Sequence, residues 1–94
     1  MDKLQKDIDR GHRAKNILED SLFVEAKEHI ESELFRLFKT VAPTDTDALQ
    51  QIKSMQYMHD KYTAFLARAV QDGKVAQMTV KERQKTLKER VFGG

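Results

Sequence analysis

The sequence predicts an all-α protein, because its apolar residues recur at steps of three and four and no stretch alternates apolar with polar residues. A single proline and four glycines leave few positions at which a helix must stop. We therefore expect an antiparallel hairpin of two long helices, with a short N-terminal helix before it and a basic C-terminal helix after it.

The first helix is expected over residues 2–18, with an apolar stripe so narrow that the helix needs a neighbour. Asp20 or Ser21 can cap the second helix, and Glu25 then lies in its first turn, where the helix dipole favours a carboxylate. The second helix has an apolar face wide enough for two neighbours, formed by Phe23, Ala26, Ile30, Leu34, Leu37 and Val41.

Residues 42–48 contain Pro43 and several Thr and Asp residues, which can end one helix and cap the next. The third helix is expected to run to about Asp72, with Gly73 as its C-cap. Thr79 and Glu82 form a capping box that would open a last helix reaching about Phe92. These elements predict a helical domain over 1–78 and a basic helix or tail over 79–94.

The apolar core of this chain is expected to be thin. A compact domain of 94 residues buries only about 60–65% of the surface that its unfolded chain exposes, and no cysteine is present to add a disulfide. Association of several chains would supply the missing burial, so we expect a homo-oligomer or a docked subunit. The last helix has few apolar residues, and we expect these to lie at an interface: Val80, Leu87 and Val91.

Positive charge is concentrated near the C-terminus. The net charge is +2, from 17 Lys and Arg against 15 Asp and Glu, yet residues 73–94 alone hold six basic and two acidic residues.

No apolar run approaches the roughly 18 residues of a membrane span, and the charged N-terminus lacks a signal-peptide core. We expect a protein of the cytoplasm that does not bind membranes.

The three histidines do not predict a metal site, because no two of them have the i, i+4 spacing that places both on one helical face. Glu25, His29 and Glu33 share a face, which is typical of an exposed salt-linked row. His59 interrupts an apolar seam, and a hydrogen-bonded core residue is favoured there over a ligand or a catalytic base.

The sequence does not predict an enzyme. Its serines lie at helix starts or exposed helical positions, without a nucleophile elbow or a glycine-rich oxyanion loop. It also lacks the glycine-rich pattern of a phosphate-binding loop. We therefore expect no catalytic residues, no cofactor and no metal.

Nucleic acid remains a candidate partner, because two basic clusters could contact phosphates. Acidic residues neutralise the first cluster and no aromatic residues are interleaved, so a solvated charged face is favoured for both. The candidate phosphate or partner contacts are Arg10, His12, Arg13, Lys81, Arg83, Lys85, Lys88 and Arg90.

Residues 9–76 resemble a family of small all-helical proteins encoded by tailed bacteriophages and prophages. The shared pattern has four parts: Gly-x-Arg-Ala at the start, then Leu-x-Asp-x-x-Phe-x-x-Ala, then a Pro-x-Asp turn, and Gly-Lys-x-Ala at the end. The matching residues are Gly11, Arg13 and Ala14, then Leu18, Asp20, Phe23 and Ala26, then Pro43 and Asp45, then Gly73, Lys74 and Ala76. This chain departs from the pattern at Ser21, where proline is common, and near Phe38, where tryptophan is common.

The resemblance implies a product of genes that lie among head and packaging genes. We therefore expect a protein that acts by assembly, as a virion, head or DNA-packaging component in the host cytoplasm or the virion. Its partner would be its own copies or another phage protein. The alternative is an oligomeric nucleic-acid or nucleotide binder, acting in packaging or sequestering a host signal. Gly11 has no side chain, so the first helix can lie close against the hairpin or kink there, and this structural interpretation is favoured. The alternative is that the Gly-x-Arg-Ala start forms a ligand-facing turn.

Overall fold

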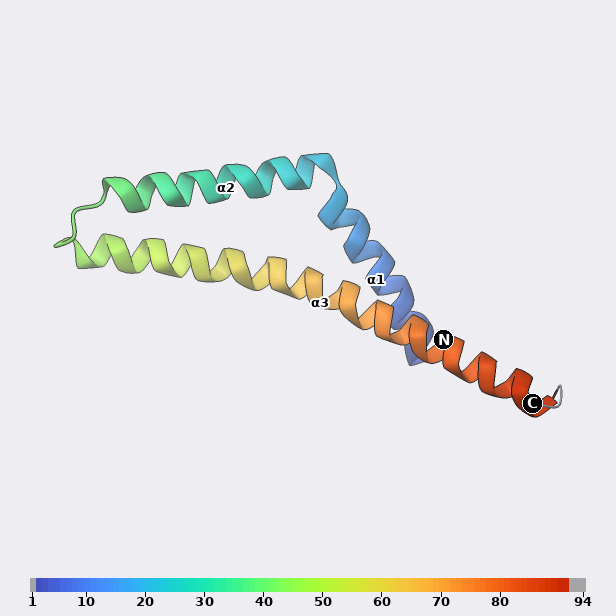
Figure 1. Ribbon diagram of the computed structural model, residues 1–94. Coiled ribbons are helices and arrows are strands. Elements are labelled where there is room, and N and C mark those ends of the chain that lie inside the picture. Colours follow the sequence, from blue (N-terminus) through green and yellow to red (C-terminus); the bar gives the residue numbers. More distant parts are fainter. Residues whose placement is uncertain (1, 92–94) are drawn as a thin grey trace. The chain divides into compact units, whose positions relative to one another are not determined.

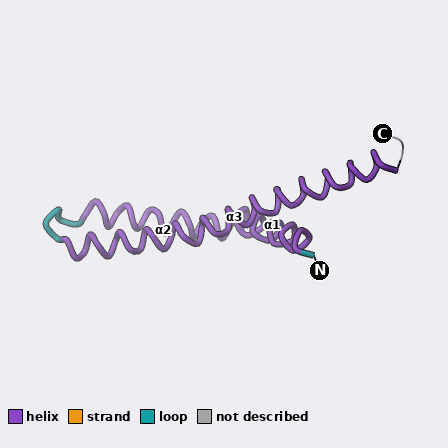
Figure 2. Tube along the Cα trace, turned by 90° about the horizontal axis from the view of Figure 1, so that it is seen from below, coloured by secondary structure: helices purple, strands orange, loops and turns teal. Residues whose placement is uncertain are grey.

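The computed structural model describes residues 2–91, and this part of the chain folds entirely into helices and short connections. The helices are α1 (Lys3–Glu19), α2 (Ser21–Thr40) and α3 (Thr46–Val91), and they occupy almost all of the trace in Figures 1 and 2. The predicted all-helical class is confirmed. The chain divides into two compact units, and α3 contributes to both of them.

Local capping fixes the boundary between α1 and α2. Asp20 has extended backbone angles, and its carboxylate accepts hydrogen bonds from the backbone amides of Leu22 and Phe23 at 2.9 and 3.1 Å. Two amides at the start of α2 that have no partner within the helix are thereby satisfied. The predicted Asp20 cap is confirmed, and it separates two helices that would otherwise run together.

The loop between α2 and α3 also lies where its residues predict the end of one helix and the start of the next. Val41 has extended backbone angles after the last turn of α2, and Pro43 follows in the loop. The Asp45 carboxylate then accepts a hydrogen bond from the backbone amide of Ala48 at 3.1 Å, which caps the start of α3. The loop is therefore slightly shorter than the predicted 42–48, because Thr46 already lies in the helix.

The first compact unit, which we call the hairpin unit, comprises Ile17–Phe65. Within it α2 and the first part of α3 run antiparallel on either side of the 41–45 loop (Figure 1). Phe23 contacts Tyr62 edge to face, with ring centroids 6.4 Å apart, so the start of α2 lies beside the middle of α3. The predicted hairpin is thus present in this unit.

The second compact unit, which we call the crossing unit, comprises residues 2–16 and 66–91 among those described. Its buried residues are all small: Gly11, Ala14, Ala69, Gly73 and Ala76. A Cβ atom added to Gly73 would lie 2.9 Å from the Cα of Gly11, closer than real Cβ atoms approach other atoms. The two helices therefore meet backbone to backbone at these glycines, which confirms the close approach predicted for Gly11.

The prediction that the third helix ends at Gly73 is wrong, because α3 continues without a break to Val91. Gly73 serves the close contact with α1 and keeps its helical conformation. Thr79 opens no new helix either, since its hydroxyl donates to the carbonyl of Val75 one turn earlier in α3. The basic segment is thus the end of α3, while a separately folding part at 79–94 stays a prediction, and residues 92–94 lie outside those described.

Candidate interaction site

The hairpin unit presents an apolar groove along one side, which we call the groove face. Both helices line it with apolar residues at steps of three and four, and its cavity volume is about 910 Å³. Its lining residues are His29, Ile30, Glu33, Leu34, Leu37, Ser54, Met55, Met58, His59, Lys61, Tyr62 and Phe65. The exposed lining of this groove is mostly apolar, so it can exclude water against an apolar partner.

Large side chains on the groove face remain open to solvent. The exposed fraction is 65% for Met58, 61% for Phe65 and 46% for Met55. Two helices alone cannot cover side chains of this size on both sides of their contact, because each helix offers the other only one stripe. The hairpin unit therefore leaves part of its apolar surface exposed to solvent.

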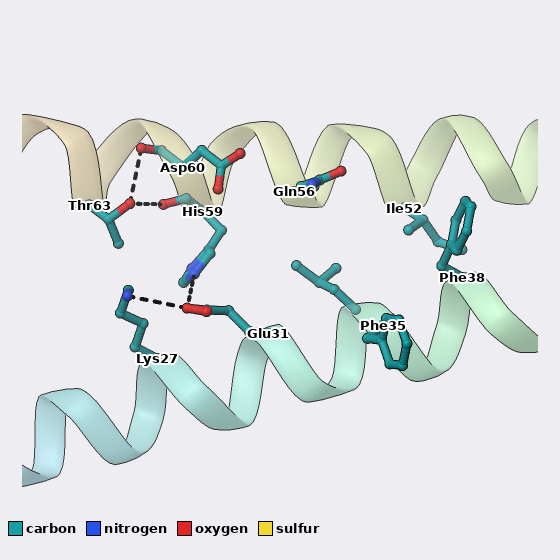
Figure 3. A pocket seen from close by; sticks show the side chains of 10 residues that line it. Lys27, Glu31, Phe35, Phe38, Ile52, Gln56, His59, Asp60 and Thr63 are labelled. Carbon is teal, nitrogen blue, oxygen red and sulfur yellow. Dashed lines mark hydrogen bonds and ion pairs between the residues drawn. The ribbon is translucent and has the colours of Figure 1, made fainter.

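His59 lies at the centre of the hairpin unit and is buried. Its Nδ1 forms a hydrogen bond of 3.2 Å with the Tyr62 hydroxyl. Its Nε2 lies 3.7 Å from a carboxylate oxygen of Glu31, as Figure 3 shows. The same Glu31 carboxylate contacts the ammonium of Lys27 at 3.3 Å. The prediction of a hydrogen-bonded core histidine is confirmed, since both ring nitrogens face polar groups of neighbouring side chains.

The opposite side of the hairpin unit is a smaller and more polar pocket of about 540 Å³. Figure 3 shows Lys27, Glu31 and Asp60 around it, together with the rings of Phe35 and Phe38 toward the loop end of α2. The apolar side chains of this pocket gather toward the loop, and charged and polar side chains line the rest of it. The groove face is the more continuous apolar surface of the two.

Glu33 and Arg36 form an ion pair at the α2 edge of the groove face. The guanidinium of Arg36 donates to Glu33 Oε2 at 2.9 and 3.3 Å. This hydrogen bonding, together with the positive charge of Arg36, holds the pKa of Glu33 below its ordinary range. Arg36, the cation that pairs with Glu33, lies outside the predicted row of Glu25, His29 and Glu33, and that row stays a prediction.

The crossing unit holds the residues that the sequence singled out as phosphate or partner contacts. Arg10, His12 and Arg13 are exposed on α1, and the amide nitrogen of Gln77 donates to His12 Nε2 at 3.0 Å. The five basic residues from Lys81 to Arg90 are exposed on the last turns of α3. Of the three predicted interface residues, Val80 is half-buried, whereas Leu87 and Val91 are exposed.

Sequence reasoning missed the groove face as a site. The steps of three and four on the third helix predict a core seam that includes Met55 and Tyr62, with Met58 and Phe65 beside it. The signal was present in the width of the apolar face on the second helix, which is enough for two neighbours where the hairpin supplies one. A comparison of the apolar faces with the number of available helices would have revealed that apolar surface is left over, but not the side on which it lies.

Other kinds of site find no support in the described part of the chain. Residues 2–91 contain no group of three or more His, Asp or Glu side chains that could hold a metal ion. None of the helices, as far as they are described, combines the length and apolar character needed to cross a membrane. No family model, curated protein or solved structure matches this chain.

Proposed function

We propose that the chain acts by assembly, as a virion, head or DNA-packaging component of a tailed bacteriophage. It binds copies of itself or another phage protein through apolar surface of the hairpin unit. The observation that carries this proposal is the groove face, where Met55, Met58 and Phe65 are about half exposed or more. The pattern shared by residues 9–76 with small phage proteins supports the viral setting.

The physical reason is the cost of leaving such a surface in water. Monomeric proteins rarely expose contiguous apolar patches of more than a few hundred Å², and larger ones mark interaction sites. Burial of one large apolar side chain contributes about 1.5–3 kcal/mol. A helical hairpin that stacks with further helices buries such side chains in a bundle core.

Mass analysis of intact phage particles and their assembly intermediates tests this proposal. We expect peptides of this chain in particles purified from a host strain that carries the encoding phage. Replacing Met58 by Glu should remove the chain from those particles, whereas Met78→Glu, at an equally exposed position of α3, should leave it there. Absence of the chain from both particles and intermediates would refute the viral role.

A second candidate function is binding of nucleic acid or a nucleotide, either as a packaging accessory or to sequester a host signal. The observation that favours it is a row of exposed lysines on α3. Lys74, Lys81, Lys85 and Lys88 follow one another at steps of seven, four and three, so they share one side of the helix. Phosphates spaced along a duplex could contact several of these ammonium groups at once.

Salt dependence separates this second function from apolar assembly. Four phosphate contacts would weaken duplex DNA binding on the order of 100-fold between 50 and 200 mM salt. Reversing Lys81, Lys85 and Lys88 to Glu should abolish that binding, whereas the control Lys53→Glu, on an exposed position of the hairpin unit, should not. Binding that is insensitive to salt and to these changes would refute the phosphate contacts.

A further inference from the structure

We propose that the groove face is occupied by the groove face of a second copy of this chain, so that two hairpin units form a four-helix bundle. This inference rests on the proposed assembly function and names its first partner. Each hairpin unit contributes α2 and the first part of α3, and α2 of one copy lies over α3 of the other. The pairing is two-fold, so each contact occurs twice.

The exposed apolar area of the large side chains is of the same order as that buried in such a dimer. Five large apolar side chains of the groove face are between 38% and 65% exposed: Ile30, Met55, Met58, Tyr62 and Phe65. A side chain of this size carries about 150–250 Å², so together they expose on the order of 500 Å². A standard interface buries about 800 Å² per partner, and in homodimers about 65% of that is apolar.

Residue spacing agrees with a bundle of four helices. Ile30, Leu34 and Leu37 follow one another on α2 at steps of four and three, and Met55, Met58, Tyr62 and Phe65 do so on α3. Such steps keep the same side of a helix in contact with a neighbour along its length. A second hairpin would thus place one of its helices over each row.

Charges at the edges determine which helices face each other. Glu33 lines the groove from α2, and Lys61 lines it from α3. A two-fold pairing that lays α2 over the partner's α3 brings the Glu33 edge of each copy to the Lys61 edge of the other. Opposite charges then meet on both edges, and the Glu33 carboxylate, already bonded to Arg36, gains a second cation.

Sedimentation equilibrium of the purified chain is the first test. We expect a dimer whose Kd rises at least about tenfold in Met58→Glu, because a carboxylate would be buried between the copies. Met78→Glu, at 66% exposure against 65% for Met58, is the matched control and should leave the Kd unchanged. Circular dichroism should show that both variants keep their helices, because each side chain is largely exposed in the single chain.

A mixing experiment tests the arrangement of the helices. Glu33→Lys and Lys61→Glu should each weaken their own dimer, because like charges then face each other at both edges. An equimolar mixture of the two variants should recover the Kd of the unchanged chain, because the mixed pair restores opposite charges at both edges. Failure of the mixture to recover would overturn the placement of α2 over α3.

The dimer and the viral role can fail separately. A chain that sediments as a monomer at several hundred micromolar, or a Met58→Glu variant with an unchanged Kd, would overturn the second copy as the occupant. The same chain could still be present in phage particles, and the assembly proposal would then stand. A dimer with the expected variants, absent from particles, would leave the inference intact and refute the viral role.

Discussion

The two compact units use the same long helix in opposite ways. Of the seven buried residues in the described chain, five belong to the crossing unit, and all five are glycine or alanine. The hairpin unit buries only Ile52 and His59, although it contains most of the large apolar side chains. Small residues therefore allow two helices to bury their contact completely, whereas large ones leave surface that only a further chain can cover.

The two units should therefore respond differently to substitutions. The crossing unit has backbone atoms in direct contact, and backbone cannot move aside as a side chain can. Substitutions that add side-chain volume at this contact should therefore destabilise the crossing unit. The hairpin unit holds its side chains at the edge of solvent, so changes there should alter association more than stability.

The largest effect is expected from added volume at the glycine contact. Gly73→Val places a Cβ atom 2.9 Å from the Cα of Gly11 and 3.0 Å from the carbonyl oxygen of Asp7. Forcing the helices apart should cost about 2–3 kcal/mol and lower the melting temperature by about 10–20 °C in a domain of this size. The control Ala67→Val adds the same kind of side chain at an exposed position of α3.

Thermal unfolding followed by circular dichroism measures both variants. If Gly73→Val melts within about 3 °C of its control, the glycines are not in close contact and the crossing unit does not differ from the hairpin unit in the way described.

A smaller effect is expected at the centre of the hairpin unit. His59→Leu removes the hydrogen bond to Tyr62 and the contact with Glu31, but leucine fills a similar space among apolar neighbours. The free energy of unfolding should change by no more than about 1.5 kcal/mol in either direction. Urea unfolding of this variant, with Gln71→Leu at an exposed position outside the groove face as the control, gives the value. Unchanged stability with abolished dimerisation would show that His59 serves binding instead of the core.

Removal of the end of α3 should cost still less. Truncation after Gln77 keeps the small buried residues Ala69, Gly73 and Ala76 and deletes a segment in which residues 81–91 are all exposed. The melting temperature should fall by less than about 8 °C, which corresponds to roughly 1 kcal/mol. Loss of the helical signal on truncation would show instead that the end of α3 supports the crossing unit. Sedimentation of the truncated chain also tests Leu87 and Val91, since an interface there predicts weaker assembly.

The sequence predicts most clearly what depends on neighbouring residues. Asp20 and Pro43 mark the ends of helices because capping and the missing amide of proline act within a few residues. Gly73 was misinterpreted because a glycine suits both a C-cap and a close helix contact, and only the distant Gly11 decides between them. His59 was predicted correctly as a core residue, since a polar residue in an apolar seam must find a partner.

The groove face could not be predicted from spacing alone. Periodicity identifies Met55, Met58 and Tyr62 as apolar positions of one helix, but their exposure depends on how many other helices reach them. That number is a property of the packed molecule. The sequence therefore shows that the helices have more apolar residues than two helices can bury, but it does not show which side of the hairpin unit leaves them exposed.

The smallest effect is expected from the ion pair at the edge of the groove face. The hydrogen bond and the positive charge of Arg36 lower the pKa of Glu33, so the pair stabilises the fold at pH values above the ordinary glutamate range. This stabilisation is lost as the pH falls through the lowered pKa of Glu33. Glu33→Gln should therefore melt slightly below the unchanged chain at pH 7 and together with it at pH 3, whereas Glu28→Gln, at another exposed glutamate of α2, should show a smaller difference at pH 7. Melting should be measured at low protein concentration, which keeps the chain monomeric. A difference in melting temperature between Glu33→Gln and the unchanged chain that persists at pH 3 would show that Glu33 acts through something other than its charge.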